Sequence, residues 1–247
     1  MSGPLAAIVR TEFLLYMREP SAFFFTLIFP LMMLMLFGSI WGNSPFDGAD
    51  FGYIDTAVPA FIGMVISTSG IMGLATSMAA YREKGILRRF RASPISPLTV
   101  LLGELGALML VTLAGVVILI LAGVLVFGMQ FRGSVPEVLP AMLLSVLSIS
   151  AVGFVPASLA STARGGMIVA NVIYFPMLFL SGAVLYKPML PDFLQVASMA
   201  FPLTYVIELL QGLWLGGHLT DYPLQIGVLA GVTVLCSAIS IRFFRWE

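Results

Sequence analysis

The chain has 247 residues, 60% of them hydrophobic and only 10% charged, with as many basic as acidic side chains and a mean hydropathy of +1.04. Soluble domains carry about 25% charged and about 45–50% apolar residues, so this composition excludes a soluble protein and predicts an all-α integral membrane protein. A net charge of zero excludes the basic surface that binds nucleic acid. The single Cys236 and single His218 exclude an internal disulfide and make a metal site unexpected.

The first predicted element is an amphipathic helix over residues 5–18 that lies on the inner surface of the membrane. Its charged residues Arg10 and Glu12 are followed about two turns later by Arg18 and Glu19 on the same helical face. Pro20 separates this helix from the first apolar run. The alternative is an irregular beginning of the first transmembrane helix. No cleaved signal peptide is expected.

Six apolar runs are each long enough to cross a hydrocarbon core of about 30 Å, which takes about 20 helical residues. They predict transmembrane helices over residues 22–42, 57–80, 98–127, 137–161, 167–186 and 224–243. Pro30 and Pro176 are expected to kink the first and fifth of them. The second run is rich in Gly, Ser and Thr, which favours close packing over a polar path, and Gly227 and Gly231 suggest close packing of the last.

The polar connection over residues 43–56 carries Asp47, Asp50 and Asp55 and is expected on the outer side. A second outer region, residues 188–216, holds two apolar pieces that are each shorter than the roughly 17 residues needed to cross. These lengths predict a re-entrant hairpin of two half-helices, with Pro202 in the first turn of the second.

The distribution of Lys and Arg predicts that both termini face the cytoplasm. With six crossings and an outer hairpin, ten of the twelve cations lie inside, and only Arg132 and Lys187 lie outside. The inner cations are Arg10, Arg18, Arg82, Lys84, Arg88, Arg89, Arg91, Arg164, Arg242 and Arg245. If the hairpin region were one further crossing, the last two arginines would move outside, against this bias.

The only long charged segment, residues 81–94, follows the second predicted span, and five of its fourteen residues are cationic. Ile86, Leu87 and Phe90 recur at helical spacing and predict a short helix with a small apolar face ringed by arginines. Its charges either set the topology alone or also form a docking site for a cytoplasmic partner. Glu104, early in the third span, is expected near the inner surface, solvated or paired with Arg88 or Arg89, in a structural or coupling role rather than in proton transfer.

The sequence contains no element that would power transport. No GxxxxGK[ST] loop is present to bind nucleotide phosphates, and no pair of acids lies in the middle of the predicted spans. One histidine in an outer loop leaves no basis for a Ser-His-Asp triad. The chain is therefore either passive or driven by a partner, and it is not expected to be an enzyme by itself.

Two motifs resemble ABC-2 type permeases, the transmembrane subunits of type V ABC exporters, and the resemblance covers essentially the whole chain. The first is Glu83-Lys84-Gly85 with Arg88-Arg89 and Arg91-Ala92-Ser93-Pro94, which is similar to the cytoplasmic loop of that family. The second is Phe201-Pro202-Leu203-Thr204-Tyr205 with Glu208. The chain departs from the family at Phe201, where Asn is common, and at Gln211, where Arg is common.

The resemblance implies a single transmembrane domain over residues 1–247 that dimerises with an identical or paralogous copy in the bacterial cytoplasmic membrane. Helix 5–18 would be the connecting helix, and helix 82–93 would be a coupling helix seated in a separate ABC ATPase subunit. Two ATPase copies would bind ATP and Mg²⁺, while this chain would hold no cofactor. The expected coupling residues are Glu83, Lys84, Gly85, Ile86, Leu87, Arg88, Arg89, Phe90 and Arg91. The outer hairpin would form an extracellular gate with Pro202, Tyr205 and Glu208.

An amphiphilic drug or a membrane lipid suits the apolar and hydroxyl-bearing walls of the predicted spans better than a hydrophilic sugar chain. Possible contacts along the translocation path are Ser67, Ser69, Tyr174, Phe175 and Phe179. The sequence leaves open a lipid-linked glycan as substrate, a secondary carrier or channel that works alone, and an assembly factor that transports nothing.

Overall fold

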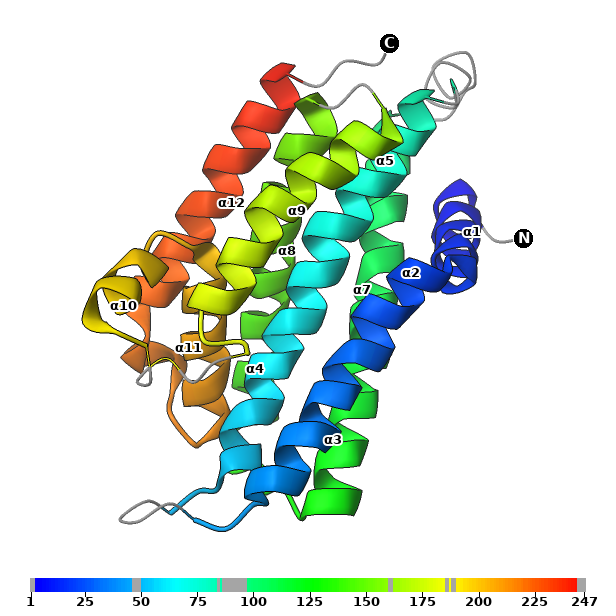
Figure 1. The fold of residues 1–247 in the computed structure, drawn as a ribbon. Helices are drawn as coiled ribbons and strands as arrows, with labels where there is room; N and C mark the ends of the chain where they lie inside the picture. Colours follow the sequence, from blue (N-terminus) through cyan, green and yellow to red (C-terminus); the bar gives the residue numbers. More distant parts are fainter. Residues whose placement is uncertain are drawn as a thin grey trace.

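A computed structural model describes residues 3–45, 50–83, 85, 97–159, 162–184, 187 and 190–243. The described chain is helical and contains no β-strand, which confirms the all-α prediction. The long helices run side by side in a bundle, and α1 lies beside one end with its axis turned away from theirs (Figure 1). We call this end of the bundle the α1 end; the connection between α3 and α4 lies at the opposite end.

Three long helical runs form the first half of the bundle. The first is α2 (Pro20–Phe23), η1 (Phe24–Ile28) and α3 (Phe29–Trp41), the second is α4 (Tyr53–Ser67), η2 (Thr68–Gly73) and α5 (Leu74–Glu83), and the third is α7 (Pro97–Phe127). The second half has α8 (Val135–Leu159), α9 (Ala163–Leu180) and α12 (Pro223–Phe243), with α10 (Asp192–Ser198), α11 (Pro202–Trp214) and η4 (Leu219–Asp221) between the last two.

Five of the described helices are long and apolar enough to cross a membrane, or up to six if the bent pair of α10 and α11 counts as one span. The fifth predicted span, 167–186, corresponds to the shorter apolar helix α9, which ends at Leu180. A multi-pass membrane protein is thus confirmed, while the count of six separate crossings with an outer hairpin remains a prediction.

Helix α1 (Pro4–Arg18) matches the helix predicted over residues 5–18 and is separate from the first span. The chain turns at Glu19, whose backbone is extended, and Pro20 begins α2 because its missing N–H is not needed in a first turn. The Glu19 carboxylate caps α2 by accepting a hydrogen bond from the Ala22 N–H.

Two wide π-helical turns interrupt the first two spans. The turn η1 lies directly before Pro30, which lacks an N–H and whose ring crowds the carbonyl four residues earlier, so the chain widens where we expected a kink. The turn η2 was not predicted. There the hydroxyls of Thr68 and Ser69 donate to the backbone carbonyls of Met64 and Val65 at 2.8 and 2.9 Å, which competes with regular helical bonding.

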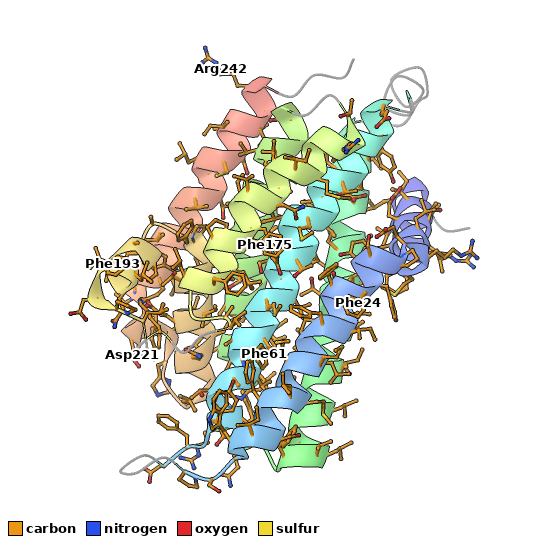
Figure 2. The ribbon with its side chains drawn as sticks, in the orientation of Figure 1. Phe24, Phe61, Phe175, Phe193, Asp221 and Arg242 are labelled. Carbon is orange, nitrogen blue, oxygen red and sulfur yellow. The ribbon has the colours of Figure 1, made fainter. Side chains whose placement is uncertain are left out.

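The second span is the centre of the bundle. In its most apolar window 89% of the residues are buried, against 11% for α12, although both helices are long and apolar. Phe61, Ile62 and Met64 of α4 are almost fully buried (Figure 2 labels Phe61). The helix lies between α3, α7, α8 and α11. This confirms the prediction that its small and hydroxyl residues serve close packing.

The backbones of η2 and α8 approach each other closely where the two cross. A Cβ added at Gly70 would lie 3.0 Å from Ile149 Cγ2 and 3.2 Å from the Ser150 backbone nitrogen. The close packing suggested for Gly227 and Gly231 of α12 does not occur among the described residues, since nothing lies within 4 Å of a Cβ added at either. These two glycines face away from the other described helices.

Gly70→Ala is therefore expected to destabilise the fold by about 1–3 kcal/mol, because the added methyl group must displace α8. Gly227→Ala is the matched control, since its methyl group meets open space and raises helix propensity. Thermal unfolding of the two variants in the same detergent measures the difference. Equal melting temperatures would contradict the tight η2–α8 crossing.

Candidate functional site

The two half-helices predicted over residues 188–216 are present as α10 and α11, which meet at an angle of 94°. Pro202 is the first residue of α11, the position where proline is best tolerated. Two α11 side chains close the corner. Thr204 Oγ1 donates to the Ser198 carbonyl oxygen at 2.6 Å, and the Tyr205 hydroxyl donates to the Met199 carbonyl oxygen at 2.9 Å.

Glu208, the third predicted gate residue, has partners that the sequence did not indicate. Its Oε1 lies 2.5 Å from Lys187 Nζ, and its Oε2 accepts a hydrogen bond from Gln225 Nε2 at 3.2 Å. The carboxylate therefore joins α11 both to the segment before the hairpin and to α12. Both charged side chains are partly exposed, so the ion pair itself contributes about 1 kcal/mol or less.

The hairpin also contacts the central helix. Gln211 Nε2 donates to the Thr56 carbonyl oxygen of α4 at 2.9 Å. Farther along, a Cβ added at Gly63 would lie 3.0 Å from Ile207 Cγ1, so α4 and α11 are in close contact. The run from α4 through α5 thus touches the hairpin near its beginning and ends at Glu83, next to the predicted coupling helix.

The coupling segment begins where α5 ends. Gly85 has a φ of +66°, the left-handed conformation that commonly terminates a helix, so the break after Glu83 has a local cause. Glu83 and Gly85 are described. The other predicted coupling residues, Lys84, Ile86, Leu87, Arg88, Arg89, Phe90 and Arg91, lie outside the described residues. The coupling helix therefore stays a prediction.

A polar cluster fills the α1 end of the bundle between α1, α5 and α7. Glu104 of α7 is only 4% exposed, so the expectation that solvent surrounds it is wrong. Its Oε1 accepts a hydrogen bond from Ser77 Oγ at 2.5 Å, and its other oxygen is buried without a donor. The Glu12 carboxyl of α1 lies in hydrogen-bonding contact with it, and the Tyr81 hydroxyl of α5 donates to Glu12.

Burial raises the pKa of Glu12 above its ordinary value, against the lowering effect of its hydrogen bonds to Tyr81 and Glu104. Burial also raises the pKa of Tyr81, helped by the negative charge of the nearby carboxyls. Glu12 was seen in the sequence only as part of a charged face. Glu104 was noted for its position in a predicted span, but no signal in the sequence pairs it with Glu12.

The five predicted path residues do not converge within one chain. Ser67, Ser69 and Tyr174 are buried, and each of their hydroxyls forms a hydrogen bond. Ser69 Oγ lies 3.0 Å from Thr112 Oγ1, and the Tyr174 hydroxyl lies 2.8 Å from Thr68 Oγ1. Phe175 and Phe179 are instead about half exposed, on the face of α9 that points away from the bundle (Figure 2 labels Phe175).

Within the described residues no group of three or more His, Cys, Asp or Glu side chains is arranged to bind a metal ion. The arrangement as a whole is a helical bundle with a bent pair on one side and a buried acidic cluster at the α1 end.

Comparison with known proteins identifies the family to which this chain is similar. Residues 4–215 match the family model described as ABC-2 type transporter. The daunorubicin resistance ABC transporter permease protein DrrB1 of Streptomyces coeruleorubidus is 25% identical over 223 residues, covering 89% of this chain and 76% of that protein. Nodulation protein J of Bradyrhizobium diazoefficiens is 30% identical over 197 residues, covering 77% and 74%. The family model covers most of the bundle together with α10 and α11, and the relatives match over most of their own length. The chain therefore belongs to the ABC-2 type transporter family of membrane transport subunits.

Proposed function

We propose that this chain is the membrane subunit of an ATP-driven exporter in the bacterial cytoplasmic membrane. Its family pairs with ABC ATPases, and the sequence has no nucleotide-binding loop of its own. Two copies of a separate ATPase, with ATP and Mg²⁺, drive two membrane subunits, identical or paralogous. Both termini of this chain face the cytoplasm, and the substrate leaves along the interface between the two subunits.

The continuous central helix carries this proposal. The run Tyr53–Glu83 has no break other than the wide turn η2, and it is buried against its neighbours for most of its length. One part contacts the hairpin through Thr56 and Gly63, and the other end leads into the coupling segment. Because packed elements move as units, a push on the coupling segment reaches the hairpin through this helix.

The substrate we propose is an amphiphilic drug or antibiotic, or a lipid. An apolar stripe on α9 is exposed along one helical face: Ile168, Val172, Phe175 and Phe179. In a dimer with a central path, such a stripe offers apolar contacts and no charge to a substrate. The naming of DrrB1 for daunorubicin resistance supports a drug of this kind over a lipid-linked glycan.

The test is ATP hydrolysis by the chain purified with its ATPase and reconstituted in lipid vesicles. Hydrolysis is expected to rise with an anthracycline or another amphiphilic amine, which also accumulates in the lumen of inside-out vesicles. Stimulation by a lipid-linked oligosaccharide alone would favour the glycan exporter. Transport by the isolated chain under an ion gradient without ATP, or no stimulation by any of these compounds, would contradict the proposal.

A further inference from the structure

The contact between α1 and α7 brings two acidic side chains together. Helix α7 has glycine at two positions that face α1: Gly103 lies against Ile8, and a Cβ added at Gly106 would lie 2.9 Å from Val9 Cγ2. Glu12 is one turn beyond Ile8 on α1, and Glu104 is next to Gly103 on α7. The two helices are therefore close at this point, and the two carboxyl groups are in hydrogen-bonding contact.

Nothing described around this pair neutralises two negative charges. The other titratable side chains that act on the pair or on its neighbours are Tyr81 of α5, Tyr16 of α1, Glu19 after α1 and Tyr174 of α9, none of which is a cation. Arg10 and Arg18 of α1 are exposed, and no lysine or arginine with a described side chain forms an ion pair with either glutamate. Two ionised carboxylates in contact in a buried site repel strongly.

One oxygen of the two carboxyl groups, Glu104 Oε2, has no hydrogen-bond donor. Ser77 donates to Glu104 Oε1 and Tyr81 donates to Glu12, so each carboxyl has one external donor. Glu104 Oε2 is buried without a donor, in a side chain that is 4% exposed. A proton on the Glu104 carboxyl would supply the donor for its hydrogen bond with Glu12.

We propose that Glu12 and Glu104 form a proton-binding site that holds one shared proton, and that this proton fastens α1 to α7. The proton belongs to the pair, so the pair releases it in a single step well above the range of an exposed carboxyl. Once it is released, two negative charges face each other and α1 loosens from the bundle. The raised pKa of Glu12 agrees with this arrangement. The inference does not depend on the proposed substrate or on the ATPase.

The test compares wild type with Glu104→Gln, whose neutral amide donates to Glu12 at every pH and so replaces the proton. Infrared spectra of the wild type at neutral pH are expected to show the C=O band of a protonated carboxylic acid, and the band should be absent in E104Q. Amide hydrogen exchange of α1, corrected for its intrinsic pH dependence, should rise about tenfold for each pH unit above the pair's pKa in the wild type. It should stay flat in E104Q.

Glu12→Gln provides a second variant should E104Q fail to insert, because removing either charge abolishes the repulsion and flattens the pH response of α1. Glu137→Gln is the matched control. This glutamate is in the first turn of α8 and lies 3.4 Å from His218, so its replacement should leave both signals as in the wild type. A wild type without a protonated carboxyl band at neutral pH, or E104Q and E12Q variants whose α1 exchange follows pH like the wild type, would overturn the proposal.

Discussion

Replacing Phe90 by aspartate is expected to abolish substrate-stimulated ATP hydrolysis and export while the chain still inserts in the membrane. Phe90 is the largest residue of the apolar face predicted for the coupling helix, and a carboxylate there would be buried against the ATPase without a partner. Central apolar anchors of interfaces contribute about 2 kcal/mol or more, which corresponds to a loss of about 30-fold in affinity for the ATPase. Arg88→Ala should show a smaller loss of the same kind.

The controls separate a docking role from a topological one. Phe90→Leu keeps an apolar anchor and should retain most of the coupling. Arg164→Ala removes a cation from the start of α9. If the ATPase recognises the coupling segment and not positive charge in general, this change should leave hydrolysis unchanged. Normal hydrolysis and transport in both Phe90→Asp and Arg88→Ala would contradict the docking role.

The positions of the helices followed from local chemistry, which is why the sequence predicted them well. Apolar runs of sufficient length marked the long helices, and Pro20 and Pro202 marked helix starts because a first turn needs no N–H from the proline. The corner between α10 and α11 followed from two apolar pieces that were each too short to cross. These signals lie within a few residues of the feature they predict.

Which faces are buried was harder to predict, because lipid is as apolar as a protein core. Both α4 and α12 are apolar along their length, yet one is central and the other is mostly uncovered. The small and hydroxyl residues of the second span were the useful signal, since they permit close approach of helices. The same reasoning did not identify a contact for Gly227 and Gly231, since a Cβ added at either meets no atom of the described residues within 4 Å.

The partners of the polar side chains depend on contacts between distant segments. Glu104 was recognised as unusual from its position in a span, but its contact with Glu12 depends on how α1 packs across α7. The pairing of Glu208 with Lys187 likewise requires the bend of the hairpin. The pattern of one sequence gives residue types and their spacing, and it does not show which distant helices pack against each other.

Asp55 illustrates the same point at the end of the bundle opposite α1. The sequence placed it in the polar connection 43–56, but α4 begins at Tyr53 and Asp55 lies in its first turn, where it is 3% exposed. Its Oδ1 accepts hydrogen bonds from Asn43 Nδ2 at 3.0 Å and from the Gln130 N–H at 2.9 Å, and its Oδ2 accepts one from the Gly52 N–H at 3.0 Å. One carboxylate thus joins the segment after α3, the start of α4 and the α7–α8 connection.

Asp55→Ala is therefore expected to destabilise the protein by about 2 kcal/mol or more. It leaves the buried Gly52 N–H and the partly buried Gln130 N–H without an acceptor, and the Asn43 amide keeps only its 3.4 Å bond to the Gly128 carbonyl oxygen. Asp55→Asn should lie between alanine and the wild type, because it keeps one oxygen but turns an N–H₂ group toward a donor. Unfolding in detergent, followed by tryptophan fluorescence, measures these differences; Trp41 packs on Tyr53, two residues from Asp55.

The matched control is Asp192→Ala, which removes an exposed aspartate from the first turn of α10 and should cost about 1 kcal/mol or less through the helix dipole. The contrast tests whether the three segments are held together at Asp55. If they are, the loss in Asp55→Ala should also loosen the nearby contact between Gln211 and Thr56, because the start of α4 is fixed by the same carboxylate. Asp55→Ala as stable as Asp192→Ala would mean that apolar packing of α4 alone positions this end of the central helix.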